Sequence, residues 1–181
     1  LGMTLAGKNL AAAQQLAPIF ASDWLQVQTS DDLLGVQYAS AFKNLISLVI
    51  GIIAGLGYGY GTQTHALSLV AAECERLAIS LGAQAKTFTF VSQCWGNDMV
   101  MSATGETRNR ALGILLGEGL NFEQALIRLQ KQGKTAESAN TLQILPKIVD
   151  LQTYPILEWL VQLTQKNTDV LRIFQLLGGG K

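Results

Sequence analysis

Lys43 is a lysine inside the largely apolar segment QYASAFKNLISLV, and its amine could exchange protons with a ligand. Burying an ammonium group costs free energy unless the group is paired. One interpretation is a side chain that reaches the surface along its aliphatic stem. The other is a partly desolvated amine that acts as a general acid or base in a binding site. The residue and its neighbours leave both interpretations open.

A second polar group, Thr107, Arg108, Asn109 and Arg110, stands where a loop is expected to pass into a helix. A hydroxyl, a guanidinium fork, an amide and the free N–H groups of a helix start are together suited to bind a phosphate. The alternative is a capped surface helix with two solvated arginines. Asp98, in WGNDMV, is either a turn residue or a carboxylate that orients a lysine or a substrate hydroxyl.

The glycine run GLGYGYG is similar to a dinucleotide-binding fingerprint only in glycine content. That fingerprint follows a strand and opens a helix, whereas this run follows an apolar helical segment. We expect a tight turn between two helices instead. A metal site is not expected, because Cys74, Cys94 and His65 are the only cysteines and the only histidine, and no pair has ligand spacing.

The composition favours a folded domain with part of its surface covered. Of 181 residues, 49% are hydrophobic and 14% are charged, against roughly 25% charged in average soluble domains. A partner domain or a second copy in a homodimer would explain the low charge. The 13 basic and 13 acidic residues balance, which argues against nucleic-acid binding.

The longest apolar run, LISLVIGIIAGL, predicts a buried helix rather than a membrane span. It is shorter than the roughly 20 residues that a span needs, and two glycines interrupt it. No secretory signal opens the chain, and two cysteines make no disulfide framework. These features favour a cytoplasmic location for the protein.

The elements that must position the polar residues are mainly helices. Residues 1–30 are the exception: a strand at 3–6, a helix at 8–17 capped by Asn9 and ended by Pro18, and a strand at 24–29. Two strands make no stable sheet alone. Residues 31–181 are predicted to form helices at 33–54, 63–81, 121–132, 137–151, 155–166 and 169–177. Asn121 and Gln124 form a capping box at the start of one of them, and Pro146 is a possible kink in another. The stretch 86–107 is the least regular, as functional loops often are.

Seven motifs, read in their order along the chain, resemble the C-terminal domain of the NAD(P)-dependent glycerol-3-phosphate dehydrogenases. They are GVQYASAFKN, GLGYGYGTQTHAL, ERLAISLGA, TF, GNDMVMSAT, TRNR and AES. The resemblance implies a mainly α fold of the 6-phosphogluconate-dehydrogenase C-terminal type. Residues 1–30 would be a β-α-β remnant of a Rossmann nucleotide-binding domain, and 31–181 the helical substrate-binding and catalytic domain. It also implies interconversion of glycerol 3-phosphate and dihydroxyacetone phosphate, in the supply of phospholipid precursors.

The resemblance also implies a role for each matching residue. Lys43 would be the catalytic proton acceptor for the C2 hydroxyl. The substrate-binding residues would be Lys43, Asn44, Asp98, Ser102, Thr107, Arg108 and Asn109. The cofactor, NAD or NADP, would be contacted by Arg108, Thr135 and Glu137 and held mainly by an N-terminal Rossmann domain that this sequence lacks.

Departures from the family pattern keep other functions open. The loop before Asp98 is longer, and the glycine of the family's VEG segment is Ser138. A non-catalytic helical dimerisation domain, a pseudoenzyme fragment, or a dehydrogenase for another small acid are the alternatives. We expect the 181 residues to be inactive alone, because nothing in them matches a pyrophosphate-binding turn.

Overall fold

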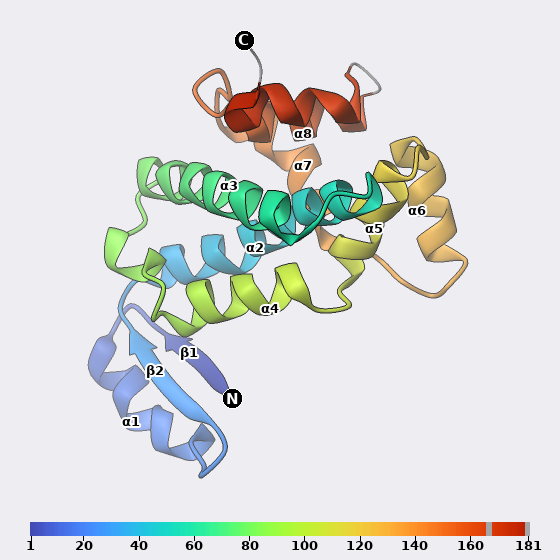
Figure 1. The fold of residues 1–181 in the computed structure, drawn as a ribbon. Helices are drawn as coiled ribbons and strands as arrows, with labels where there is room; N and C mark the ends of the chain where they lie inside the picture. The colour runs from blue at the N-terminus through green and yellow to red at the C-terminus, as the bar shows by residue number, and fades with distance from the viewer. Residues whose placement is uncertain (166–167, 180–181) are drawn as a thin grey trace.

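The structure, a computed structural model, describes residues 1–165 and 168–179. A small unit of two strands and a helix projects from one end of a helical body (Figure 1). Its elements are β1 (Gly2–Ala6), α1 (Leu10–Phe20) and β2 (Gln26–Ser30). The body contains α2 (Leu33–Gly55), α3 (Tyr60–Ser80), α4 (Asp98–Thr104), α5 (Arg108–Gly117), α6 (Phe122–Gln130), α7 (Glu137–Ile148) and α8 (Pro155–Thr164).

The N-terminal unit is a parallel β-α-β crossover. Met3 pairs with Val27 and Leu5 with Thr29, and Asn9 caps α1 through its side chain, as the sequence predicts. The predicted stop at Pro18 is wrong, because α1 continues to Phe20. A proline near the end of a helix removes only one hydrogen bond, and the N–H of Ala21 closes the last turn on the carbonyl of Ala17.

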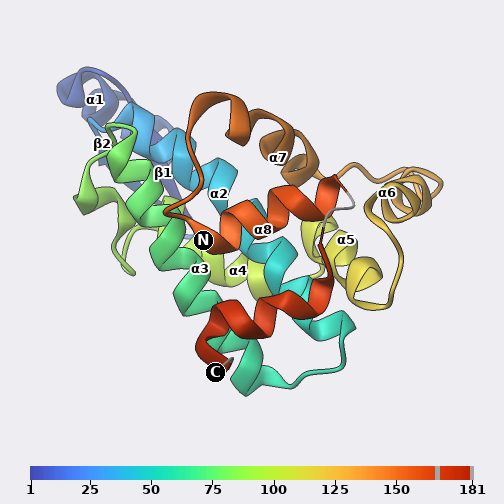
Figure 2. The same ribbon diagram turned by 90° about the horizontal axis from the view of Figure 1, so that it is seen from above.

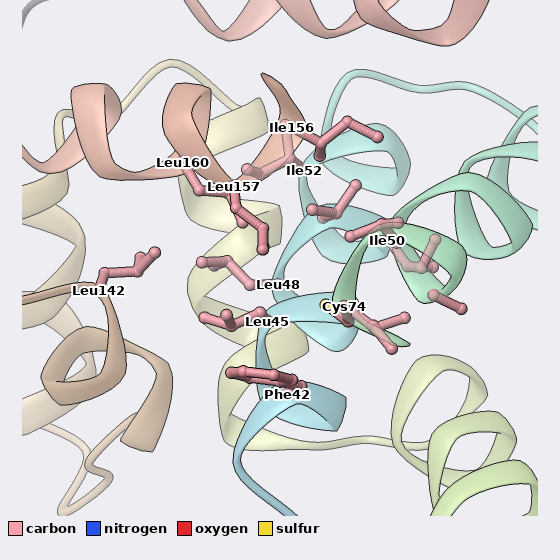
Figure 3. Packing of buried hydrophobic residues seen from close by; sticks show 14 of the residues in the cluster. Phe42, Leu45, Leu48, Ile50, Ile52, Cys74, Leu142, Ile156, Leu157 and Leu160 are labelled. Atoms are coloured by element: carbon pink, nitrogen blue, oxygen red, sulfur yellow. The ribbon is translucent and has the colours of Figure 1, made fainter. Parts of the chain in front are cut away.

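Helix α2 is the core of the molecule. From Leu45 to Ile53 every residue is buried, and α3, α4, α5 and α7 pack against α2 (Figure 2). Its leucines and isoleucines belong to one cluster with residues of α3, α7 and α8, and Figure 3 shows Leu45 and Leu48 near Leu142 and Leu157. In the described part of the chain α2 is the one helix long and apolar enough to cross a membrane; 61% of its apolar window is buried in the fold, as in a core helix.

Four glycines let α5 lie against α2 at backbone distance. A Cβ atom at Gly51 would lie 2.2 Å from the carbonyl oxygen of Arg110, and one at Gly113 would lie 2.2 Å from that of Leu48. Gly55 and Gly117, four residues further along each helix, are equally close to the opposite backbone. This approach fixes the first turn of α5, which carries Arg108, relative to α2, which carries Lys43.

Most other boundaries agree with the sequence, but the C-terminal end does not. The glycine run forms the expected turn, the capping box opens α6, and Pro155 starts α8. Pro146 lies inside α7 without splitting it. The predicted end of α8 at residue 166 lies outside the described residues.

The predicted helix at 169–177 is helical but not a regular α-helix. This segment forms a 3₁₀ turn (Val170–Arg172) and a π turn (Gln175–Gly179). Two of its carbonyl groups are engaged by side chains of the body: Trp159 Nε1 donates to the Asp169 carbonyl, and His65 Nε2 lies 3.0 Å from that of Leu177. Tertiary contacts therefore replace the regular helical ladder.

Candidate active site

Lys43 and Asp98 form an ion pair between α2 and α4. The Nζ atom of Lys43 lies 2.7 Å from Oδ2 of Asp98, and the two side chains are 20% and 27% exposed. The Lys43 ammonium group is therefore mostly buried, and its charge is paired with a carboxylate. Partial burial on an apolar helix makes this amine a candidate for proton transfer to a bound ligand.

A π turn and a close backbone approach place Asp98 at the start of α4. The irregular segment that the sequence places before Asp98 contains a short 3₁₀ helix (Ala85–Phe88) and then the π turn (Gln93–Asn97) that leads into α4. A Cβ atom at Gly96 would lie 1.9 Å from the Phe90 carbonyl oxygen. Such turns are frequent at functional sites because they re-aim the side chains that follow. In this arrangement the carboxylate of Asp98 reaches Lys43.

Ser47 links the lysine-bearing face of α2 to the start of α5. It is fully buried; its hydroxyl donates to the Ser102 carbonyl at 2.6 Å and lies 2.8 Å from Oγ1 of Thr107. Thr107 is the N-cap of α5 and accepts from the N–H of Arg110. Sequence reasoning did not include Ser47 in the site, although a polar residue four positions after Lys43 lies on the same helix face.

Asn109 connects three elements through one side-chain amide. Its Nδ2 donates to Oδ1 of Asn44 at 2.9 Å and to Oε2 of Glu137 at 3.1 Å. Its Oδ1 accepts from the N–H of Ser138 at 2.9 Å. Asn109 is 3% exposed, so it holds α2, α5 and the start of α7 together. Asn44 and Asn109 follow Lys43 and Arg108 in sequence, and their hydrogen bond brings these two stretches of chain together.

Arg108 lies at the surface of this network. Its Nη2 donates to Oε1 of Glu137, and the two side chains are 54% and 45% exposed. A cavity of about 320 Å³ adjoins it and is lined by Glu106, Thr107, Arg108, Arg110, Ala111, Ile114 and Lys134. Arg108, Arg110 and Lys134 outnumber the carboxylates of Glu106 and Glu137, and the first turn of α5 adds partial positive charge, so the region is suitable for an anion.

The sequence-predicted residues fall into three sets. Lys43 and Asp98 pair directly, while Thr107, Arg108, Asn109, Asn44 and Glu137 share the hydrogen-bonded junction of α2, α5 and α7. Ser102 is buried and joins this junction through its carbonyl oxygen. Thr135 is exposed in the connection before α7, and its side chain enters none of these contacts.

Comparison with known proteins shows the family to which the chain belongs. Residues 32–175 match the family model of the NAD-dependent glycerol-3-phosphate dehydrogenase C-terminus. The chain belongs to the NAD-dependent glycerol-3-phosphate dehydrogenase family. The match covers α2 to the end of α8 and includes every residue of the site.

Curated relatives are longer glycerol-3-phosphate dehydrogenases that use NAD(P)+. The relative from Trichlorobacter lovleyi is 39% identical over 138 residues, which are 74% of this chain and 41% of that protein. The relative from Citrifermentans bemidjiense is 33% identical over 169 residues, which are 91% of this chain and 49% of that protein. The chain thus spans about half the length of the curated relatives it matches.

Solved structures confirm the fold. Glycerol-3-phosphate dehydrogenase from Coxiella burnetii superposes with a TM-score of 0.83 at 22% identity, over 98% of this chain and 54% of that one. The enzyme from Saccharomyces cerevisiae gives a TM-score of 0.80 at 19% identity, over 91% of this chain and 48% of that one. The mainly α architecture expected from the sequence is therefore confirmed.

Proposed function

We propose that this chain is the substrate-binding and proton-transferring part of an NAD(P)-dependent glycerol-3-phosphate dehydrogenase. The observation that carries the proposal is the junction at which α2 presents the Lys43–Asp98 pair and α5 presents Arg108 at its first turn, tied together by the Asn44–Asn109 hydrogen bond. The relatives that bear this name support the assignment of substrate.

The phosphate of glycerol 3-phosphate would bind at the start of α5. Arg108 is half exposed and offers a planar fork of N–H donors, while the helix N-terminus adds partial positive charge. Asn109 and Thr107 keep that first turn in place through their bonds to α2 and α7. The dianionic end of the substrate is thus directed to Arg108.

The C2 oxygen would then meet Lys43. In the direction of reduction, the Lys43 ammonium donates a proton to the C2 oxygen as that carbon is reduced; in the direction of oxidation, the neutral amine accepts it. Asp98 holds the amine in position at 2.7 Å. Asn44, the next residue in α2, would contact the same part of the substrate.

The nicotinamide cofactor would accept or supply the hydride at C2. On this chain, the exposed donor set at the edge of the junction fits such a ligand: the Arg108 guanidinium suits a pyrophosphate, and the Glu137 carboxylate suits a ribose hydroxyl. Thr135, exposed beside them, completes the proposed contacts. The rest of the Rossmann domain, of which β1 and β2 would form part, would hold the remainder of the dinucleotide.

The division into domains, the cellular location and the partner surfaces form part of the same proposal. Residues 1–30 would belong to the nucleotide-binding domain and 31–181 to the catalytic domain, with the parallel β1–β2 pair and its α1 crossover as support. The free, buried thiols of Cys74 and Cys94 suit the cytoplasm. Exposed apolar residues such as Phe90 and Trp24 suit a covering domain or a homodimer partner.

A chimera tests the proposal. Residues 32–175 would replace the matching C-terminal part of the Trichlorobacter lovleyi relative, and reduction of dihydroxyacetone phosphate would be followed with NADH and NADPH. Activity that disappears when Lys43 is replaced supports the proposal. A folded chimera that binds the cofactor but shows no catalytic activity would favour the alternative that this chain is a non-catalytic helical domain. Turnover of an unphosphorylated hydroxy acid in preference to glycerol 3-phosphate would favour another dehydrogenase.

A further inference from the structure

Glu137 binds two consecutive residues of α5 with its two carboxylate oxygens. Oε1 accepts from Nη2 of Arg108, and Oε2 accepts from Nδ2 of Asn109 at 3.1 Å. The first contact is half exposed, whereas the second lies against a side chain that is 3% exposed. A single carboxylate therefore joins the exposed end of an arginine to a buried, hydrogen-bonded amide.

The buried half of this contact makes Glu137 a fixed point. The N–H of Ser138, the next residue, donates to Oδ1 of Asn109 at 2.9 Å, so the first turn of α7 is bound to Asn109 by two hydrogen bonds. Asn109 is in turn bound to Asn44 on the core helix. A carboxylate held this way restricts the many rotamers that an exposed arginine would otherwise sample.

We infer that Glu137 is a positioning residue that pre-orders Arg108 for the substrate phosphate. The inference rests on the proposed function, and it differs from the cofactor contact that the family resemblance implies for the same residue. Arg108 has five N–H donors, and the bond to Glu137 uses one nitrogen of the fork. The remaining edge of the guanidinium is presented to a phosphate in a fixed orientation.

Charge and positioning predict opposite effects, which makes the inference testable. A carboxylate near an anion site repels the anion, so its removal would tighten phosphate binding if charge alone mattered. If Glu137 instead holds Arg108 in place, its removal weakens binding, because the arginine must be ordered at the moment the phosphate binds. The sign of the change therefore decides between the two.

The experiment is a titration of the full chain with inorganic phosphate and with glycerol 3-phosphate, followed by the arginine Nε–H signals in NMR. Glu137→Gln, which keeps an acceptor for Asn109 but removes the ion pair, is expected to weaken both ligands about 3- to 10-fold. Glu106→Gln is the matched control: Glu106 lines the cavity beside Arg108, and the change removes one negative charge while leaving the Arg108–Glu137 pair intact. This variant is expected to bind both ligands as tightly as the unaltered chain or slightly more tightly.

Each result has one meaning. If the unaltered chain binds neither ligand, the proposed function itself fails. If it binds and Glu137→Gln binds equally or more tightly, the proposed function stands and the positioning role is wrong. In an Arg108→Lys background Glu137→Gln should have no further effect on binding, and an undiminished effect there would also overturn the inference. Should Glu137→Gln fail to fold, Glu137→Asp, too short to reach both partners, is expected to show the same weakening, and unchanged binding by it would overturn the inference.

Discussion

Lys43 and Asp98 stand 55 residues apart in the chain, and their side chains meet at 2.7 Å. The pair joins the core helix to the helix that follows the π turn. One turn further along α2, Ser47 bonds to Thr107, the N-cap of α5. In the proposed function, this paired amine is the group that moves the proton.

Lys43→Met in the chimeric enzyme should lower kcat by on the order of 10²- to 10⁴-fold, because a general acid–base contributes about that much. The KM for glycerol 3-phosphate should change far less. Lys86→Met is the matched control, since Lys86 also pairs with an aspartate at 2.7 Å but is 60% exposed and lies outside the site. Equal kcat in the Lys43 variant and the control would remove Lys43 from the chemistry.

Arg108→Lys should raise the KM for glycerol 3-phosphate roughly 10- to 100-fold, because a lysine keeps the charge but loses the planar fork. Steady-state kinetics with varied substrate would measure it. Arg128→Lys, in the last turn of α6, should leave the KM unchanged. An unaltered KM in the Arg108 variant would mean that the phosphate is bound elsewhere.

Gly113→Ala should destabilise the fold by about 1–3 kcal/mol or more, because the new methyl group would lie 2.2 Å from the Leu48 carbonyl oxygen. Gly61→Ala, in α3 with nothing within 4 Å of the added atom, should be neutral or stabilise by about 0.5–1 kcal/mol. Urea unfolding of the two variants would measure the difference. Equal stability of both would show that α2 and α5 do not approach as closely as described.

Glu73 should make stability depend on pH. It is 3% exposed, and its Oε1 accepts from the N–H of Leu157 at 2.7 Å. Burial raises the pKa of this carboxyl, while the backbone bonds at the start of α8 and nearby Arg76 lower it by less. Between the ordinary pKa of 4.5 and the raised one, the folded state binds more protons than the unfolded state. Its contribution to stability therefore falls as pH rises through that window.

Glu73→Gln should remove this dependence, since the amide keeps an acceptor for Leu157 and carries no charge to bury. The urea midpoint, measured from pH 4.5 to 8, should decline less with pH in the variant than in the unaltered chain, with no loss of stability at pH 7. Glu75→Gln, a less buried carboxylate on the same helix, should keep the original slope. An identical slope for Glu73→Gln would place the pH dependence elsewhere.

Sequence patterns predicted the helices with strong local signals. Asn9, the Asn121–Gln124 box and Pro155 are local devices, and each opens a helix where it was expected. The irregular geometry of the C-terminal segment was not predicted, because the carbonyl groups of Asp169 and Leu177 have partners outside the segment, Trp159 and His65. No local pattern reports such partners.

The sequence predicted which residues form the site but not how their side chains are arranged. The order of motifs identified Lys43, Asp98 and Arg108, yet only the structure shows which carboxylate each cation binds. Ser47 was missed because a serine in an apolar run carries no motif. The Gly51 and Gly113 contact was also hidden, since a glycine spacing alone does not name the helix that it faces.

One titration bears on the whole proposal: glycerol 3-phosphate added to the full chain, with the Lys43 Nζ and Arg108 Nε signals followed together by NMR. Both signals should shift with the same Kd, and glycerol without the phosphate should shift neither at the same concentrations. Arg108 responding while Lys43 stays unchanged, or two different Kd values, would show that one substrate molecule does not reach both groups and would contradict the proposed chemistry.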